Sequence, residues 1–378
     1  DVQKAVIDFE YPEKCEIRSY KPTTKGNYVQ VRRVMAALEE AEKPLICIGG
    51  GVFAAHAENE IRELADLMQI PVITTMMGIS VFPDDDQLFC GMIGTHGVKM
   101  ANAAVNECDV LFLVGARVGD RAVKTPLALE KTTKIIHIDI DPAEIGKNIG
   151  ADLPLVGDAK LVLQQMTELA KPMKHDEWIA HIKTLGGERK YVEPAKGTVN
   201  PRVFIDRLAK KMPANVTVVA DVGQNQIWTC TEYKFRKEGR LLTSGGMGTM
   251  GYSVPAAIGA KMADNSRATV AICGDGAFQM SFMELATAVQ FGVDIKVVVM
   301  TNNRLGMVRE LQTNGYHDRQ TAVFLDGSPD FIKLAEAYSI PAMRVYDDDT
   351  MEKGIEMLAE HKGICLVEVV VDKDMPTL

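Results

Sequence analysis

The chain has 378 residues, of which 47% are hydrophobic and 25% charged, and its formal net charge is −9. This length and apolar content predict two globular domains and exclude a disordered chain, and the acidic balance argues against binding to nucleic acid or membrane surfaces. The seven cysteines are scattered, and neither a signal peptide nor a membrane-spanning run is evident, so we expect a cytoplasmic protein without a disulfide framework or structural zinc.

Helix-like and strand-like segments alternate along the first half of the chain. Residues 1–27 contain Pro12, Pro22 and Gly26 and are predicted to form an extended lead-in. After this lead-in, the apolar spacing predicts helices at 31–42, 57–69 and 101–109 and strands at 44–51, 71–75, 110–116 and 134–141. Short β-branched runs separated by amphipathic helices indicate parallel strands covered on both faces, in a first domain over residues 28–170.

The same alternation returns after residue 200. It predicts helices at 203–212, 254–263 and 283–292 and strands at 215–223, 267–276 and 295–303. The segment 171–200, which contains Pro, Gly and mixed charge, is predicted to be a linker with one short helix around Trp178. We therefore predict an α/β fold with two doubly wound parallel-sheet domains, the second over residues 201–378.

Two oxygen-bearing side chains follow neighbouring predicted strands of the second domain. Asp275 lies in GDG at the end of one strand and Asn302 in NN at the end of the next, with one helix between them. A single βαβ crossover brings both to the same sheet edge, where ligands bind in parallel sheets. A carboxylate and an amide oxygen suit Mg²⁺ that shares a diphosphate. GDG alone would favour a turn that merely caps a helix, but the Asn at this spacing favours a metal–diphosphate site.

Four longer motifs surround these residues: DVGQNQIW (221–228), SGGMGTMGYSVPAAIGA (244–260), GDGAFQMSFMELATAV (274–289) and NNRLGMVRELQ (302–312). Their order and spacing resemble the catalytic subunit of acetohydroxyacid synthase (acetolactate synthase), a thiamin diphosphate-dependent enzyme. GGG, TTMMG, GARVGDR and IDIDPAEIGKN in the first half fit the same family's central domain, so the resemblance covers nearly the whole chain. It implies a central nucleotide-binding-type domain followed by a domain that binds thiamin diphosphate.

The resemblance implies that Mg²⁺ is held by the side chains of Asp275 and Asn302 and the backbone carbonyl of Arg304. It also implies a set of thiamin diphosphate contacts: Gly223, Gln224, Asn225, Gly248, Met250, Asp275, Gly276, Ala277, Asn302, Leu305, Gly306 and Met307. The family more often has His at the position of Asn225, which alters one contact to the diphosphate. Met250 and Met307 could by themselves be ordinary core residues, but the flanking glycines favour a cofactor contact.

Glycines and polar residues also follow the predicted strands of the first domain. Because GxGxxG is absent, these residues alone favour structural turns over a nucleotide site. The resemblance implies that the edge holds FAD through Gly50, Thr75, Met76, Met77, His96, Gly115, Arg117, Asp120, Arg121, Asp139 and Ile140. The family's RFDDR reads RVGDR here at 117–121, and some relatives lack FAD.

The implied activity is that of a transferase of branched-chain amino-acid biosynthesis, which decarboxylates pyruvate and condenses the product with a second 2-oxo acid. The glutamate that activates the cofactor belongs in this family to an N-terminal pyrimidine domain, and no glutamate here matches it. The catalytic residue is therefore unknown, and we expect the chain alone to be inactive. The implied partners are a further copy in a homodimer or homotetramer and a regulatory small subunit. Leu311 replaces the usual Trp, which leaves the choice of acceptor open.

Other interpretations remain at this stage. A different thiamin diphosphate-dependent decarboxylase, carboligase or flavin oxidase would share both domains. A non-catalytic relic that still binds the cofactor would share the motifs as well. An NAD-binding module built on the first domain would leave GDG and NN unexplained. The acidic runs at 84–86 and 347–349 are expected to be solvated loops.

Overall fold

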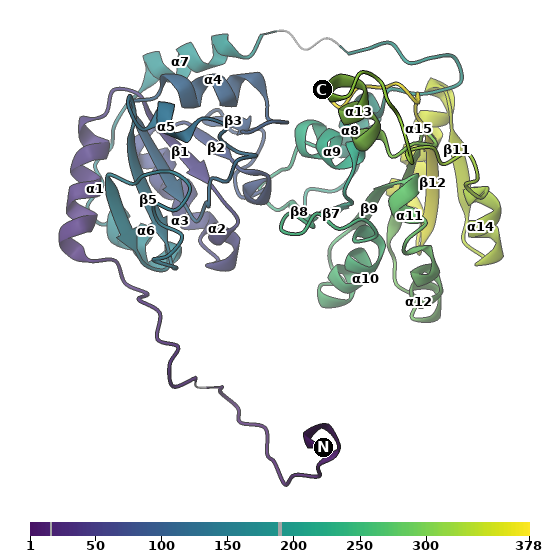
Figure 1. Cartoon of the computed structure of the whole chain (residues 1–378), viewed down its shortest axis with the longest axis horizontal. Coiled ribbons are helices and arrows are strands. Elements are labelled where there is room, and N and C mark those ends of the chain that lie inside the picture. The colour runs from purple at the N-terminus through teal and green to yellow at the C-terminus, as the bar shows by residue number, and fades with distance from the viewer. Residues whose placement is uncertain (16, 188–190) are drawn as a thin grey trace.

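Two six-stranded parallel sheets, each covered by helices on both faces, form the body of the protein (Figure 1). The computed structural model describes residues 1–15, 17–187 and 191–378. Glu16 of the expected lead-in and residues 188–190 of the expected linker lie outside the described residues. The predicted α/β fold with two parallel sheets is confirmed.

The first sheet has the strand order β3-β2-β1-β4-β5-β6. Its strands are β1 (Pro44–Ile48), β2 (Val72–Thr74), β3 (Phe89–Met92), β4 (Val110–Val114), β5 (Lys134–Asp139) and β6 (Leu153–Val156). Its helices are α1 (Tyr28–Glu40), α2 (Gly51–Ala54), α3 (Glu58–Met68), α4 (Lys99–Glu107), α5 (Pro126–Leu129), α6 (Ala159–Thr167) and α7 (Asp176–Leu185). The order reverses between β1 and β4, which is where doubly wound sheets bind ligands.

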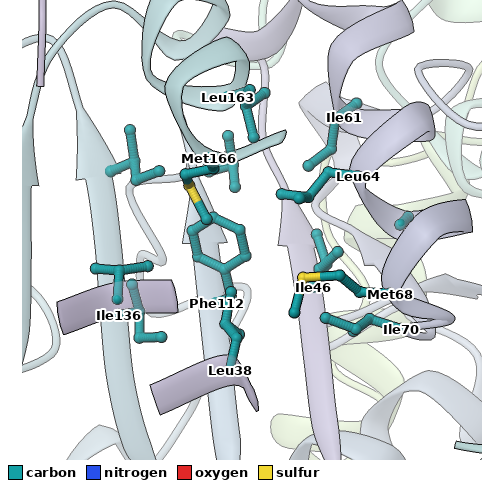
Figure 2. Close-up of a cluster of buried hydrophobic side chains, with 14 of the residues drawn as sticks. Leu38, Ile46, Ile61, Leu64, Met68, Ile70, Phe112, Ile136, Leu163 and Met166 are labelled. Atoms are coloured by element: carbon teal, nitrogen blue, oxygen red, sulfur yellow. The ribbon is translucent and has the colours of Figure 1, made fainter. Parts of the chain in front are cut away.

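Alternate residues of the first sheet fill two separate cores, as expected for strands buried on both faces. Phe112 and Ile46 point to the face covered by α1, α3 and α6, where Leu38, Leu64 and Met166 pack against them (Figure 2). The intervening strand residues, such as Leu111, face α4 and α7 on the other side. The sheet is thereby fixed from both sides, and only its ends remain open to ligands.

The second sheet has the order β11-β12-β10-β9-β7-β8. Its strands are β7 (Thr217–Ala220), β8 (Arg240–Thr243), β9 (Thr269–Gly274), β10 (Lys296–Thr301), β11 (Ala342–Val345) and β12 (Cys365–Val370). Its helices are α8 (Pro201–Lys211), α9 (Gln224–Glu232), α10 (Ser253–Ala263), α11 (Asp275–Phe278), α12 (Leu285–Gln290), α13 (Gly306–Gly315), α14 (Phe331–Ala337) and α15 (Asp348–Glu360). This order reverses between β7 and β9, so the two motifs DVGQNQIW and GDGAF follow the strands on either side of the switch point.

The strands end earlier than the sequence predicts because the glycines and acids after them turn out of the sheet. The described part of residues 1–27 contains only the 3₁₀ turn Val2–Lys4 and extends away from the body (Figure 1). The short helix predicted around Trp178 is α7, with ten residues. Among the residues that the structure describes, no helix combines the length and apolar character needed to cross a bilayer.

Loops of the first unit contact the second unit directly. The backbone N–H of Asp84 donates to the carbonyl of Phe235 (2.8 Å), and the N–H of Phe235 donates to the Asp84 carboxylate (2.9 Å). Ser80 Oγ accepts from the backbone N–H of Leu241 at 2.9 Å. The expectation of a solvated acidic loop at 84–86 is therefore wrong for Asp84, whose side chain is only 10% exposed. Its hydrogen bonds with Phe235 of the second unit keep this side chain buried although it is polar.

Candidate active site

Asp275 lies at the first turn after β9, directly beside the end of β10. Its Oδ2 accepts hydrogen bonds from the backbone N–H groups of Asn302 (3.1 Å) and Asn303 (2.6 Å), and its Oδ1 accepts from Gly276 N–H (2.8 Å). The carboxylate is almost fully buried. Burial raises its pKa to about 6, and the same three N–H groups act in the opposite direction. The expected approach of the GDG and NN motifs at one sheet edge is present.

The second Asn of the NN pair makes the turn that follows β10. Asn303 has a left-handed backbone (φ 54°), a conformation that Asn tolerates better than most residues. The chain then doubles back, so that Arg304 N–H donates to Asn302 Oδ1 at 3.1 Å. The groups expected to hold Mg²⁺ are therefore a carboxylate that follows β9 and, in the turn that follows β10, one amide and one carbonyl. Among the described residues, no cluster of three or more His, Cys, Asp or Glu side chains suits a metal.

The start of α9 supplies the other wall of the site. Gly223 precedes the helix with φ 146°, a conformation that L side chains rarely adopt. Gln224 is buried, and its Oε1 accepts from Asn302 Nδ2 at 3.3 Å. Asn225 is also buried, and its Nδ2 donates to the carbonyls of Asp221 (2.8 Å) and Ile272 (3.2 Å). The donor atoms of Asn225 are therefore bonded within the protein rather than turned toward a ligand.

Asp221 organises the glycine-rich loop, although the sequence analysis did not single it out. Its side chain is 0% exposed and accepts three backbone N–H bonds, from Val222 (2.9 Å), Gly251 (3.0 Å) and Ser253 (2.7 Å). These bonds tie the segment after β8 to the end of β7. An Asp immediately after a buried strand and before a glycine was the available signal, because parallel strands place such a residue at the ligand edge.

A cavity lies between these elements. Of the expected thiamin diphosphate and Mg²⁺ residues, twelve line it: Gly223, Gln224, Asn225, Met250, Asp275, Gly276, Ala277, Asn302, Arg304, Leu305, Gly306 and Met307. Gly248 is exposed and does not line the cavity. The lining residues that the sequence analysis missed are Val222, Trp228, Gly274, Met300, Val308 and Val371. Helical spacing from Gln224 could have indicated Trp228, whereas Val371 is brought there only by the tertiary fold.

The residues expected to contact FAD follow β1, β2, β4 and β5 at the carboxyl edge of the first sheet. The Gly49, Gly51 and Gly115 backbones pack so closely that a Cβ on any of them would overlap its neighbour. Met77 reaches across to the backbone of Gly245 in the second unit. Arg117, Asp120, Arg121 and Ile140 are exposed, Met76 and Asp139 are half-buried, and Gly50 and Thr75 lie at the ends of β1 and β2.

His96 connects this edge to the second unit. Its loop is held by a hydrogen bond from Thr95 N–H to the Arg121 carbonyl (2.9 Å). Burial lowers the pKa of His96, the nearby Glu310 of α13 raises it, and Arg121 and Lys124 lower it further. Among the expected FAD residues, His96 is thus close enough to α13 for Glu310 to affect its pKa.

Comparison with known proteins agrees with this arrangement. Residues 31–166 match the thiamine pyrophosphate enzyme central domain, and residues 221–369 match the C-terminal TPP binding domain of the same enzymes. The chain belongs to the thiamine pyrophosphate enzymes. The resemblance found in the motifs is thus confirmed, and every cavity-lining residue except Val371 falls within the matched TPP binding domain.

Curated relatives of this thiamine pyrophosphate enzyme are acetolactate synthase large subunits. It is 39% identical to the probable large subunit of Methanocaldococcus jannaschii, over 98% of this chain and 65% of that protein. It is 38% identical to the large subunit of Corynebacterium glutamicum, over 99% and 62%. Identity to the isozyme 3 large subunit of Escherichia coli is 34%, over 97% and 66%. The chain therefore spans slightly less than two thirds of the length of these relatives.

Proposed function

We propose that this chain is the central and C-terminal part of an acetolactate synthase catalytic subunit that uses thiamin diphosphate and Mg²⁺. The cavity between β7, β9 and β10 is the observation that carries the proposal, because it gathers the GDG, NN and DVGQNQ motifs from three separate strands. The large-subunit relatives support the choice of activity. The substrates are then pyruvate and a second 2-oxo acid, and the activity is that of the whole longer protein.

The residues of the cavity fit a hydrated Mg²⁺ bound to a diphosphate. Asp275, the Asn302 side chain and the Arg304 carbonyl would supply oxygen ligands, which Mg²⁺ prefers. Burial has already raised the pKa of Asp275 to about 6, so a cation beside it would compensate a desolvated negative charge. Gly223 before α9, and Gly274 and Gly276 at or just after the end of β9, leave backbone without side chains in the cavity lining, which permits close approach of the phosphate oxygens.

When bound, thiamin diphosphate would supply the electron sink for decarboxylation of a 2-oxo acid and for the following carbon–carbon bond formation. The described residues would orient and shield the reacting groups. Met250, just before α10, and Met307, on α13, both line the cavity and would shield the reacting groups from water. Leu311 on α13 is 62% exposed and would leave the acceptor side open. Among the described residues, no glutamate lines the cavity, and we expect the chain alone to be inactive.

We further propose FAD at the carboxyl edge of the first sheet. The exposed Arg117 and Arg121 would meet a pyrophosphate, and Asp139 at the end of β5 would accept from a ribose hydroxyl. We also propose that the protein associates with a further copy of itself, with a regulatory small subunit or with both. We propose neither a nucleic-acid nor a membrane partner. FAD absorbance retained after gel filtration of the FAD-incubated chain would test the flavin part.

Trp228 allows a direct test of the main proposal, because it is one of only two tryptophans and lines the cavity. We expect thiamin diphosphate to change the tryptophan fluorescence when Mg²⁺ is present and EDTA to reverse the change. Asp275→Ala should abolish the response, whereas Asp349→Ala on the exposed start of α15 should retain it. A response in Asp275→Ala equal to that of the unmodified chain would count against the site. Acetolactate made from pyruvate by the 378-residue chain alone would contradict the expected need for further residues.

A further inference from the structure

A chain of hydrogen bonds leads from α13 to the expected metal ligand, and its inner link is Gln224. Glu310 and the C-terminal segment Met375–Thr377 lie on one side of the Gln224 amide, and Asn302 lies on the other. Gln224 is 4% exposed, and Met375 and Thr377 are also buried. The amide is therefore largely shielded from bulk water, and each of its hydrogen bonds described here is made to a protein group.

The partners of Gln224 Nε2 are acceptors. It donates to the carbonyl of Met375 (2.9 Å), to Thr377 Oγ1 (3.2 Å) and to Glu310 Oε2 (3.3 Å). A carbonyl and a carboxylate can only accept, so they hold the NH₂ end of Gln224 on their side. The hydroxyl of Thr377 in turn donates to Glu310, which leaves its lone pairs for Gln224. The Oε1 end of Gln224 must then face Asn302.

That orientation is one of two constraints on the next amide; the other is the backbone N–H of Arg304, which can only donate and so selects the Oδ1 end of Asn302. Gln224 Oε1 can only accept, so it selects the Nδ2 end of Asn302, which donates to it at 3.3 Å. The Oδ1 end of Asn302 is left on the side of the Asp275 turn, where it accepts from Arg304 N–H. A hard divalent cation needs this oxygen, because a flipped amide would present its NH₂ group.

The packing around Gln224 supports a fixed amide. A Cβ added at Gly306 would overlap Gln224 Oε1, so the amide lies directly against bare backbone. Glu310 itself is held, since its carboxylate also accepts from Thr377 N–H at 3.2 and 3.3 Å. Oxygens of Glu310, Met375 and Thr377 therefore all accept from Gln224, and the Thr377 N–H and hydroxyl hold the Glu310 carboxylate in place.

We propose that Glu310 is a positioning residue that fixes, through Gln224, which end of the Asn302 amide faces the bound cation. The proposal rests on the Mg²⁺–thiamin diphosphate site of the proposed function and adds to it an outer residue with a defined role. The competing account is a purely structural one, in which Glu310 only anchors the C-terminal segment through Thr377. The two accounts differ in whether the effect of Glu310 depends on the identity of residue 302.

The test is a double-substitution cycle with Glu310→Gln and Asn302→Asp. The readout is the apparent Mg²⁺ affinity, measured from tryptophan fluorescence at saturating thiamin diphosphate, and circular dichroism checks that each variant is folded. Glu310→Gln should weaken Mg²⁺ binding by roughly 10- to 100-fold, as outer partners of metal ligands do. An Asp at position 302 presents an oxygen at either end of its side chain. In the Asn302→Asp background, Glu310→Gln should therefore not weaken Mg²⁺ binding further, and it should restore part of the Mg²⁺ affinity that Asn302→Asp loses.

Asp374→Asn is the matched control, because it removes a carboxylate from the same C-terminal segment without touching Gln224. Asp374 pairs with Lys373 (3.4 Å) and distantly with Arg309 (3.8 Å), and its side chain is 64% exposed. An unchanged Mg²⁺ affinity in Asp374→Asn supports the proposal. Equal weakening by Glu310→Gln in both backgrounds, or no weakening in either, overturns it. Absence of any Mg²⁺-dependent signal in the unmodified chain overturns the proposed function and this inference together.

Discussion

Asp221 connects the end of β7 to the segment after β8 through the two oxygens of one buried side chain. In Asp221→Asn, an NH₂ group would replace one of the accepting oxygens and face a backbone N–H that has no other partner. We expect a loss of about 1–3 kcal/mol in the free energy of unfolding, because a buried donor is left unsatisfied. Urea denaturation followed by circular dichroism measures this loss.

The matched comparison for Asp221 is Asp349→Asn, the same change at an exposed position of α15. It should leave the urea midpoint nearly unchanged. If the two substitutions lowered stability equally, the three hydrogen bonds of Asp221 would not be the cause. Weaker thiamin diphosphate binding in Asp221→Asn, beyond that explained by unfolding, would indicate that the glycine-rich loop had also shifted.

Gly306 is a second residue whose identity is set by a neighbour. In Gly306→Ala the new Cβ would displace the Gln224 amide and, through it, Asn302. We expect roughly tenfold or greater weakening of Mg²⁺-dependent thiamin diphosphate binding, the size seen when outer partners of a metal site are disturbed. Fluorescence titration checks it. Gly315→Ala at the other end of α13, where a Cβ meets no atom within 4 Å, should bind as the unmodified chain does.

Part of the site was predictable at this scale and part was not. Asp275 and Asn302 follow consecutive strands, so their chain separation was enough to place them together. Asp221 and Gln224 depend on partners up to 153 positions away, at Gly251 and in the C-terminal segment. Such partners leave no local pattern, because a hydrogen bond between distant segments does not constrain spacing along the chain.

At the scale of elements, two helical glycines show that packing decides whether a Gly→Ala substitution stabilises or destabilises the protein. Gly259 lies within α10, and a Cβ there would meet no atom within 4 Å. Gly259→Ala should therefore stabilise the protein by about 0.5–1 kcal/mol, the helix cost of glycine relative to alanine. Gly354 lies within α15, and its Cβ would be 2.6 Å from Val345 Cγ2. Gly354→Ala should therefore destabilise the protein.

Thermal or urea unfolding of the two variants, measured side by side, tests this opposite effect. The unmodified chain is the reference for both. Stabilisation by Gly354→Ala would mean that α15 can move away from the sheet at little cost. Destabilisation by Gly259→Ala would contradict the open space that surrounds this position of α10.

Helix α9 shows where periodicity fails for a whole element. Its sequence QNQIWTCTE is mostly polar, yet all nine residues are buried. It packs against α8 and the end of β9, and Trp228 Nε1 donates to the carbonyl of Pro376 at 3.1 Å. A helix enclosed on every side has no solvent face, so no amphipathic pattern could predict it. The polar residues are tolerated because internal partners satisfy them.

At the scale of the whole molecule, Asp84 makes the contact between the two units sensitive to pH. Burial raises the pKa of Asp84 from 3.8 to about 6, while Lys234 and the Phe235 N–H oppose the shift. The folded protein then binds this proton more tightly than the unfolded chain does. Asp84 therefore lowers stability progressively as pH rises from about 4 to about 6, and its full cost is present above pH 6.

Asp84→Asn should remove that dependence while its amide oxygen still accepts from Phe235 N–H. The stability of the unmodified chain relative to this variant should improve by roughly 3 kcal/mol between pH 7 and pH 4, the value of a shift of about two pKa units. Urea unfolding at several pH values measures the difference. Asp85→Asn, its exposed neighbour, should show no such slope. A pH-independent difference for Asp84→Asn would contradict the raised pKa.

The α/β class, the two parallel sheets and the approach of GDG to NN follow from the sequence alone. These features arise from short-range periodicity and from the single crossover that links neighbouring strands, so residues that are close in the chain are enough to predict them. Only the tertiary structure decided that Asp84 is buried between the units, that α9 is enclosed, and that the Gln224 amide has one orientation. Each of these depends on segments far apart in the chain, where desolvation and hydrogen-bond partners are set by packing rather than by neighbouring residues.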